Sequence, residues 1–109
     1  MTEIKLTSGL PKGESINGLA PLASNLASEP EQLHVAVIVF DCSKITIDTD
    51  TGEASPTVRI RRIEPITRLE DKKRLNSLTR RAFEERTGKA VLPLELEDEL
   101  RAAFGGDDD

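Results

Sequence analysis

The chain has 109 residues, of which 3 % are aromatic and 32 % charged, and its formal net charge is -5. This length fits one domain with a core of Val, Ile, Leu and Ala, and leaves no room for two. A single cysteine excludes an internal disulfide, and no apolar run approaches the roughly 20 residues that span a membrane. We therefore expect a cytoplasmic protein without a signal peptide.

The first 32 residues mix loop signals with two short elements. The sequence "EIKL" has the composition of a short strand, and glycine and proline make the following residues a loop. A short N-terminal helix is expected after it, because Pro21 suits a first turn and Leu22 and Leu26 share one helical face. Pro30 ends this helix.

Three strands are predicted next, at residues 33–41, 43–49 and 56–66. The first is rich in β-branched residues, and the second and third alternate in polarity. The turn between the last two contains Gly52, which adopts positive φ readily. Short connections between consecutive strands predict an antiparallel meander with 43–49 in its centre.

The strand at 33–41 is apolar on both faces, although the predicted order places it at an edge. Val35, Val37 and Val39 lie on one face, and the other face is also apolar. An exposed apolar edge promotes aggregation, so something must cover it. Either "EIKL" pairs with it as a fourth strand, or another copy of the chain does. These three valines are therefore the candidate interface residues.

Two helices complete the expected fold. Thr67 and Glu70 match a capping box, and the helix that follows ends at Gly88. Pro93 leads into a second helix at 95–104, with its apolar residues on one face. We expect one α+β domain at 1–104, with a three-stranded or four-stranded meander, both helices packed on one sheet face, and a disordered acidic tail at 105–109.

Few residues offer catalytic or metal-binding chemistry. The chain has one histidine, His34, and one cysteine, Cys42, which are too few for a structural zinc site. About 26 Å of extended strand would separate them, too far for a catalytic Cys–His dyad. Cys42 is expected to fill apolar space and His34 to start a strand. The acidic residues within 48–53 predict a hairpin turn. Those within 95–99 lie at the start of a predicted helix, where negative charge interacts favourably with the helix dipole. We expect no enzyme, no metal and no cofactor.

Charge is distributed unevenly along the chain. Residues 56–90 carry a net charge of +6, while 1–55 carry -5 and 91–109 carry -6. A basic stripe of this kind is typical of nucleic-acid binding. The candidate nucleic-acid-binding residues are Arg59, Arg61, Lys72, Lys73, Arg80 and Arg81. No aromatic residue accompanies them for base stacking. The alternatives are neutralisation by the domain's own acids and binding of an acidic protein.

Two stretches, "SKITIDTDTGEASPTVRIRRIEPI" and "LTRRAFEERTGKAVLPLELEDEL", resemble small orphan proteins of actinobacteria and their phages, over about residues 33–104. This resemblance implies a phage accessory role and carries over no site residues. The order helix, three strands, helix is also similar to a double-stranded-RNA-binding domain, but the acidic start of the helix after the strands departs from that family. Topology alone does not establish a function.

The sequence thus predicts a small non-enzymatic binding protein. The first hypothesis is a phage or bacterial accessory factor that contacts nucleic acid through the basic strand and helix, with Asp107–Asp109 competing for the patch. The alternative is a protein-interaction module: a homodimer through the edge strand at 33–41, or an inhibitor or adaptor of a host protein. The sequence leaves the partner's identity open.

Overall fold

The computed structural model describes residues 3–89 and 94–104. These residues form two compact units. The sheet unit takes its described residues from Met1–Ala23 and Val37–Glu64, and the helix unit takes them from Ser24–Ala36 and Pro65–Asp109. The sequence prediction of an α+β fold is confirmed. The packing of the C-terminal helices on a sheet face stays a prediction.

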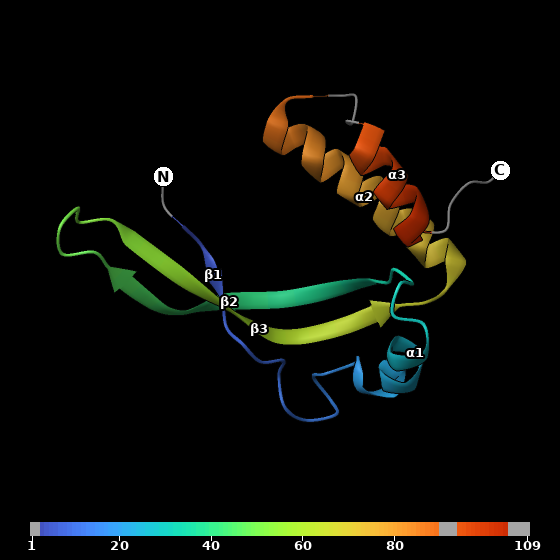
Figure 1. Ribbon diagram of the computed structural model, residues 1–109. Coiled ribbons are helices and arrows are strands. Elements are labelled where there is room, and N and C mark those ends of the chain that lie inside the picture. Colours follow the sequence, from blue (N-terminus) through green and yellow to red (C-terminus); the bar gives the residue numbers. More distant parts are fainter. Residues whose placement is uncertain (1–2, 90–93, 105–109) are drawn as a thin grey trace. The chain divides into compact units, whose positions relative to one another are not determined.

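The sheet of the described residues contains one long hairpin and one short strand. Strands β2 (Val35–Ile47) and β3 (Ala54–Ile66) have 13 residues each, and β1 (Lys5–Leu6) has two (Figure 1). The strand order is β1-β3-β2, so β3 lies in the centre and β2 at an edge. β1 runs parallel to β3, which makes the sheet mixed.

The predicted meander is therefore wrong. The strands expected at 33–41 and 43–49 are one continuous strand, β2, and the central strand is β3 instead of 43–49. The polar residues at 41–43 looked like a break between strands. Asp41 instead pairs with arginines of β3, so the chain continues through it in an extended conformation.

The N-terminal segment covers the other edge of β3. Lys5 aligns with Thr57, and the Thr7 amide donates to the Val58 carbonyl over 2.9 Å. Further along, Ile63 donates its amide to the Ile16 carbonyl over 2.9 Å and accepts a bond from the amide of Gly18. The sequence "EIKL" thus pairs with β3, so of the two alternatives for covering 33–41 the one that uses "EIKL" is wrong.

The hairpin turn at 48–53 is the predicted Asx turn. The Asp48 carboxylate accepts bonds from the backbone amides of Asp50 and Thr51, at 2.8 and 3.2 Å. Gly52 has a φ of 78° and donates its amide to the Asp48 carbonyl over 2.7 Å. The side chain of Asp48 therefore holds the turn, as the hairpin interpretation of this acidic stretch predicts.

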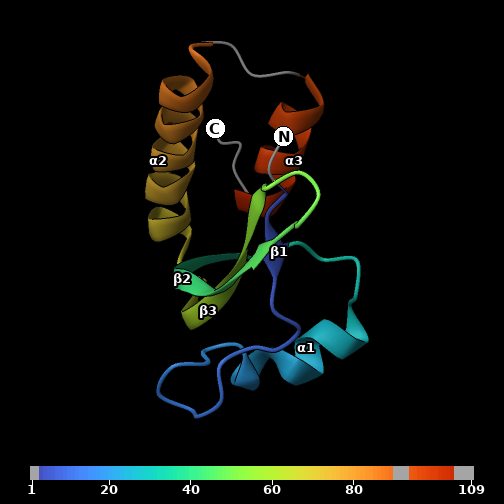
Figure 2. The same ribbon diagram turned by 90° about the vertical axis from the view of Figure 1, so that its left-hand side faces the viewer.

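The helices agree with the prediction in position but not in capping. A 3-10 turn at Ala20–Leu22 (η1) with Pro21 near its start precedes α1 (Ala23–Ser28). Helix α2 (Leu69–Thr87) ends at Gly88, whose φ is 73°, and α3 (Leu94–Phe104) lies beside α2 (Figure 2). The N-cap of α2 is Arg68 without a side-chain cap bond, so the predicted capping box is wrong by one residue.

Little of the described chain is buried. The buried hydrophobic residues are Ile63 in the sheet unit and Leu100 and Phe104 in the helix unit, and Thr57 is the buried polar residue. Many large apolar side chains are instead exposed, most of those in the sheet unit on β2. Within the described residues, no helix has the length and apolar character needed to cross a membrane.

Candidate interaction edge

The most unusual surface of the sheet unit is the part of β2 from Val37 to Ile47, here called the β2 edge. Alternation along the strand places Val37, Val39, Ile45 and Ile47 on one face and Ile38 and Phe40 on the other. Val39 is 53 % exposed and Phe40 59 % exposed, so neither face of the strand is covered. Single exposed apolar residues are ordinary, but a row of them on both faces is not.

The β2 edge also exposes its backbone. Because β2 is last in the strand order, no strand among the described residues pairs with its outer side. Peptide groups along such an edge are ready to pair with another extended chain, and proteins usually shorten or charge their edge strands to prevent it. β2 is long and, between Val37 and Ile47, carries charge only at Asp41 and Lys44.

Of the predicted interface residues, Val37 and Val39 are exposed at this edge, whereas Val35 is half-buried at its start. Sequence reasoning missed Ile45 and Ile47, which are both 63 % exposed. The signal was present, because the alternation of residues 43–49 continues the face of Val37 and Val39. The expected break at 41–43 concealed it.

Asp41 lies in the middle of β2 and binds two arginines of β3. Arg59 donates two hydrogen bonds to its carboxylate, at 3.0 and 2.8 Å, and Arg61 donates one at 3.3 Å. Arg59's hydrogen bonds lower the pKa of Asp41 despite its partial desolvation, and raise that of Arg59. Two of the predicted nucleic-acid contacts thus neutralise an acid of the same sheet.

We expect the fold to lose this ion pair's contribution in acid. The folded pKa of Asp41 lies below its unfolded value near 3.9, so the pair stabilises the fold above that pH and loses its effect as pH falls through the folded pKa. The variant Asp41→Asn should therefore show a smaller loss of urea midpoint between neutral and strongly acidic pH. An equal loss in both proteins would exclude this role.

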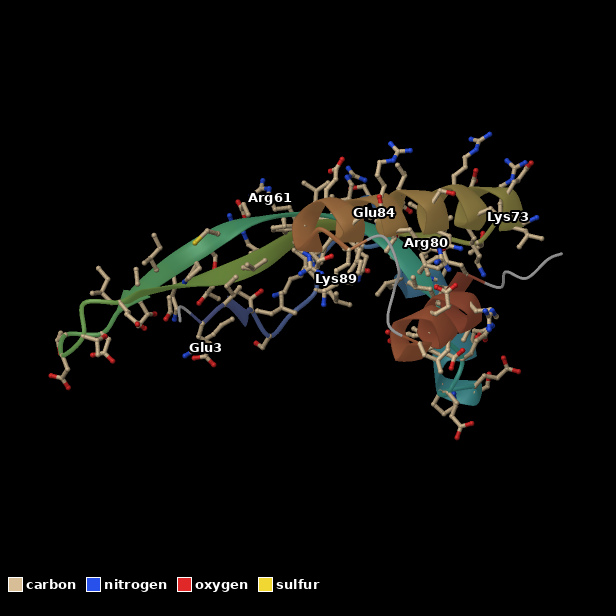
Figure 3. The ribbon with its side chains drawn as sticks, turned by 90° about the horizontal axis from the view of Figure 1, so that it is seen from above. Glu3, Arg61, Lys73, Arg80, Glu84 and Lys89 are labelled. Atoms are coloured by element: carbon tan, nitrogen blue, oxygen red, sulfur yellow. The ribbon has the colours of Figure 1, made fainter. Side chains whose placement is uncertain are left out.

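The cations of α2 lie in the helix unit. Arg80 makes two hydrogen bonds to Glu97 of α3, at 2.7 and 3.0 Å, which lower the pKa of Glu97 (Figure 3). Lys72, Lys73 and Arg81 have no ion pair within the part of the chain that the structure describes. The six predicted residues are thus divided between two units, and three of them are already bound to acids.

His34 and Cys42 belong to different units. His34 precedes β2, half-buried, and its Nε2 atom is buried without a hydrogen-bond partner. Cys42 lies in the middle of that strand. Cys42 is exposed, which makes the prediction that it fills apolar space wrong. Its exposure follows from its position on the β2 edge.

Metal-binding groups and the acidic tail are the remaining features to consider. Within the described ranges, no three His, Cys, Asp or Glu residues form a group that could hold a metal ion. The acidic tail, Asp107–Asp109, lies outside the described residues. No protein-family model, curated protein or solved structure matches this chain. The β2 edge and the Arg59–Asp41–Arg61 cluster are therefore the candidate functional features of this chain.

Proposed function

We propose that this protein is a non-enzymatic protein-interaction module that binds a partner strand along the β2 edge. Strand addition uses main-chain hydrogen bonds for affinity and alternate side chains for specificity. The observation that carries the proposal is the exposure of apolar side chains on both faces of a long edge strand, with Ile45 and Ile47 each 63 % exposed.

The Arg59–Asp41–Arg61 cluster supports this proposal. An isolated carboxylate in the middle of an apolar strand would oppose the approach of a second strand, because its desolvation is costly. Arg59 and Arg61 neutralise Asp41 from within the sheet, and the two side-chain bonds from Arg59 fix its carboxylate. The edge can therefore be covered without leaving an unpaired acid.

We take the protein to act in the reducing cytosol as an accessory factor. Its one cysteine, Cys42, is exposed on the edge. In that compartment the thiol stays reduced, so the edge remains free for a partner strand.

Selection of short linear peptides against the immobilised full chain tests whether the edge accepts a strand. We expect enriched peptides to be extended and alternately apolar. The double variant Val39→Lys/Ile45→Lys should lose them, because lysine on an edge strand opposes pairing. Leu78→Lys is the matched control: Leu78 is 52 % exposed but lies on α2. Equal peptide binding by all three proteins would disprove strand addition at β2.

Nucleic-acid binding is the second candidate, and the cations of α2 favour it. Lys73 and Arg81 are exposed, and no described acid pairs with them or with Lys72. Cations without intramolecular partners are available to phosphates, and binding through them would weaken as salt rises. Arg59, Arg61 and Arg80 would have to leave their carboxylates to contribute.

Fluorescence anisotropy with labelled duplex DNA, duplex RNA and single strands separates these two candidates. If nucleic acid is the ligand, affinity should fall steeply with salt and with Lys73→Ala/Arg81→Ala. The affinity should change little in the variant Arg59→Ala/Arg61→Ala, because these two arginines form ion pairs with Asp41. Absence of binding at low salt would remove the nucleic-acid candidate.

A further inference from the structure

We propose that the partner is a second copy of this chain, whose β2 edge pairs antiparallel with the first about a two-fold axis at Cys42. This inference rests on the proposed function and identifies its partner. Closed dimers with two-fold symmetry are the commonest protein assemblies, and their interface must be complementary to itself. β2 must therefore be complementary to a second β2 that runs in the opposite direction.

Two-fold symmetry restricts the register strongly. In an antiparallel pair each residue lies directly opposite one residue of the partner strand. When both strands are the same segment, the axis passes through one residue that lies opposite its own copy. Each choice of central residue then fixes every other pair, so only a few registers need to be compared.

Centring the pair on Cys42 matches apolar residues with apolar residues. Val37 then lies opposite Ile47 of the second copy, and Val39 lies opposite its Ile45. These side chains occupy the same face of β2, so two copies would form two apolar clusters on that face, one on each side of the axis. Asp41 lies opposite Ser43, a small polar residue, in the middle of the row.

The other face also accepts this register. Ile38 lies opposite Thr46, whose methyl group can pack against it. Phe40 lies opposite Lys44, whose aliphatic stem can cover the ring while its ammonium group stays in water. Phe40 is 59 % exposed in the single chain. No like charges lie opposite each other on either face.

Neighbouring registers are less favourable because of the position of Asp41. Centring on Asp41 would place two carboxylates opposite each other, and centring on Ser43 would place Asp41 opposite Ile45. Both arrangements are unfavourable, because like charges repel and an apolar neighbour cannot solvate a carboxylate. In the Cys42 register, the two Asp41 residues are diagonal neighbours, about 7 to 8 Å apart. Each already binds its own Arg59 and Arg61.

The proposed pairing lies wholly within one compact unit. Residues 37–47 pair with residues 47–37 of the second copy, and all of them belong to the sheet unit. A pairing of this length along an open strand would extend the sheet across the axis, with β1 at each outer end. β2 would then be a central strand, with its backbone paired on both sides.

Cysteine cross-linking of the full chain tests the register. Opposite residues of an antiparallel pair have Cα atoms about 4.5 to 5.5 Å apart, within the range of a disulfide. Diamide should therefore convert the wild-type chain to a disulfide-linked dimer, taking up the two electrons and two protons that the Cys42 thiols release. Asp50→Cys in a Cys42→Ser background is the control for random collision, because Asp50 lies exposed in the hairpin turn.

The decisive arm mixes two variants that each lack Cys42. Val39→Cys and Ile45→Cys, both with Cys42→Ser, should form a mixed disulfide in high yield and little of either self-linked dimer. Residue 39 lies about 20 Å from its own copy in the Cys42 register. Light scattering should show that the Cys42→Ser chain without oxidant is still a dimer.

Two results would overturn the inference. A chain that remains a monomer at every concentration has no second copy as partner, and a dimer that forms self-linked Val39→Cys or no mixed disulfide has another register. Both are distinguishable from failure of the proposed function when the peptide selection uses chain immobilised too sparsely to pair with itself, because the β2 edge is then open to peptides.

Discussion

The double substitution Val39→Lys/Ile45→Lys is expected to weaken self-association by at least about 100-fold. Burying a Val or Ile side chain contributes about 1.5 to 3 kcal/mol, and the proposed interface contains four of these side chains, two from each copy. Even half of the lower bound for each side chain totals about 3 kcal/mol, which is a factor of about 100 in affinity. Sedimentation velocity over a range of concentrations would measure the change.

The monomer should tolerate these two substitutions. Val39 is 53 % exposed and Ile45 63 % exposed, so neither contributes much to the core of the single chain. Leu78→Lys changes an equally exposed leucine of α2 and should leave self-association unchanged. Wild-type and double-variant chains with the same dimer affinity would show that these side chains are not at the interface.

Ile63→Ala is expected to lower the free energy of unfolding by about 2 to 5 kcal/mol. Ile63 is 8 % exposed and is the buried hydrophobic residue of the sheet unit among the described residues. Its backbone bonds to Ile16 and Gly18 remain in the variant, so the change isolates side-chain packing. Small domains have stabilities of about 5 to 15 kcal/mol, and a loss of this size approaches the lower end.

Urea denaturation with Ile4→Ala as the control would measure this effect. Ile4 is 68 % exposed and precedes β1, so its truncation removes little buried surface. Comparable losses in the two variants would mean that Ile63 does not hold the N-terminal segment on β3. That result would contradict the packing described for the sheet unit.

The helices and the turn were predictable because local signals determine them. Periodic apolar residues and Gly88 fix the extent and the end of α2, and Asp48 and Gly52 fix the hairpin turn. The predicted N-cap residue of α2 was wrong by one position. A threonine at 67 satisfies the motif in sequence, but the helix begins after Arg68, and cap positions depend on where the chain enters the helix.

The sheet order was not predictable, because long-range contacts determine it. β1 has two residues, and nothing in its sequence indicates that it runs parallel to β3. Within the continuous β2, Asp41 binds Arg59 and Arg61 across the hairpin, and no local pattern in the sequence indicates these contacts. All three arginines of β3 have partners within the chain: Arg59 and Arg61 neutralise Asp41, and Arg62 donates to the Ser15 carbonyl.

Amide hydrogen exchange of the full chain, at high concentration and on dilution, would show whether a second chain covers the β2 edge. If a second chain covers the β2 edge, the outward-facing amides of residues 37–47 should exchange slowly in concentrated protein and faster on dilution, while the amides of 57–63 in β3 change little. In the variant Val39→Lys/Ile45→Lys, the outward-facing amides of 37–47 should exchange rapidly at both concentrations. Exchange of these outward-facing amides that is independent of concentration and of the two lysines would contradict the claim that a second chain covers the β2 edge.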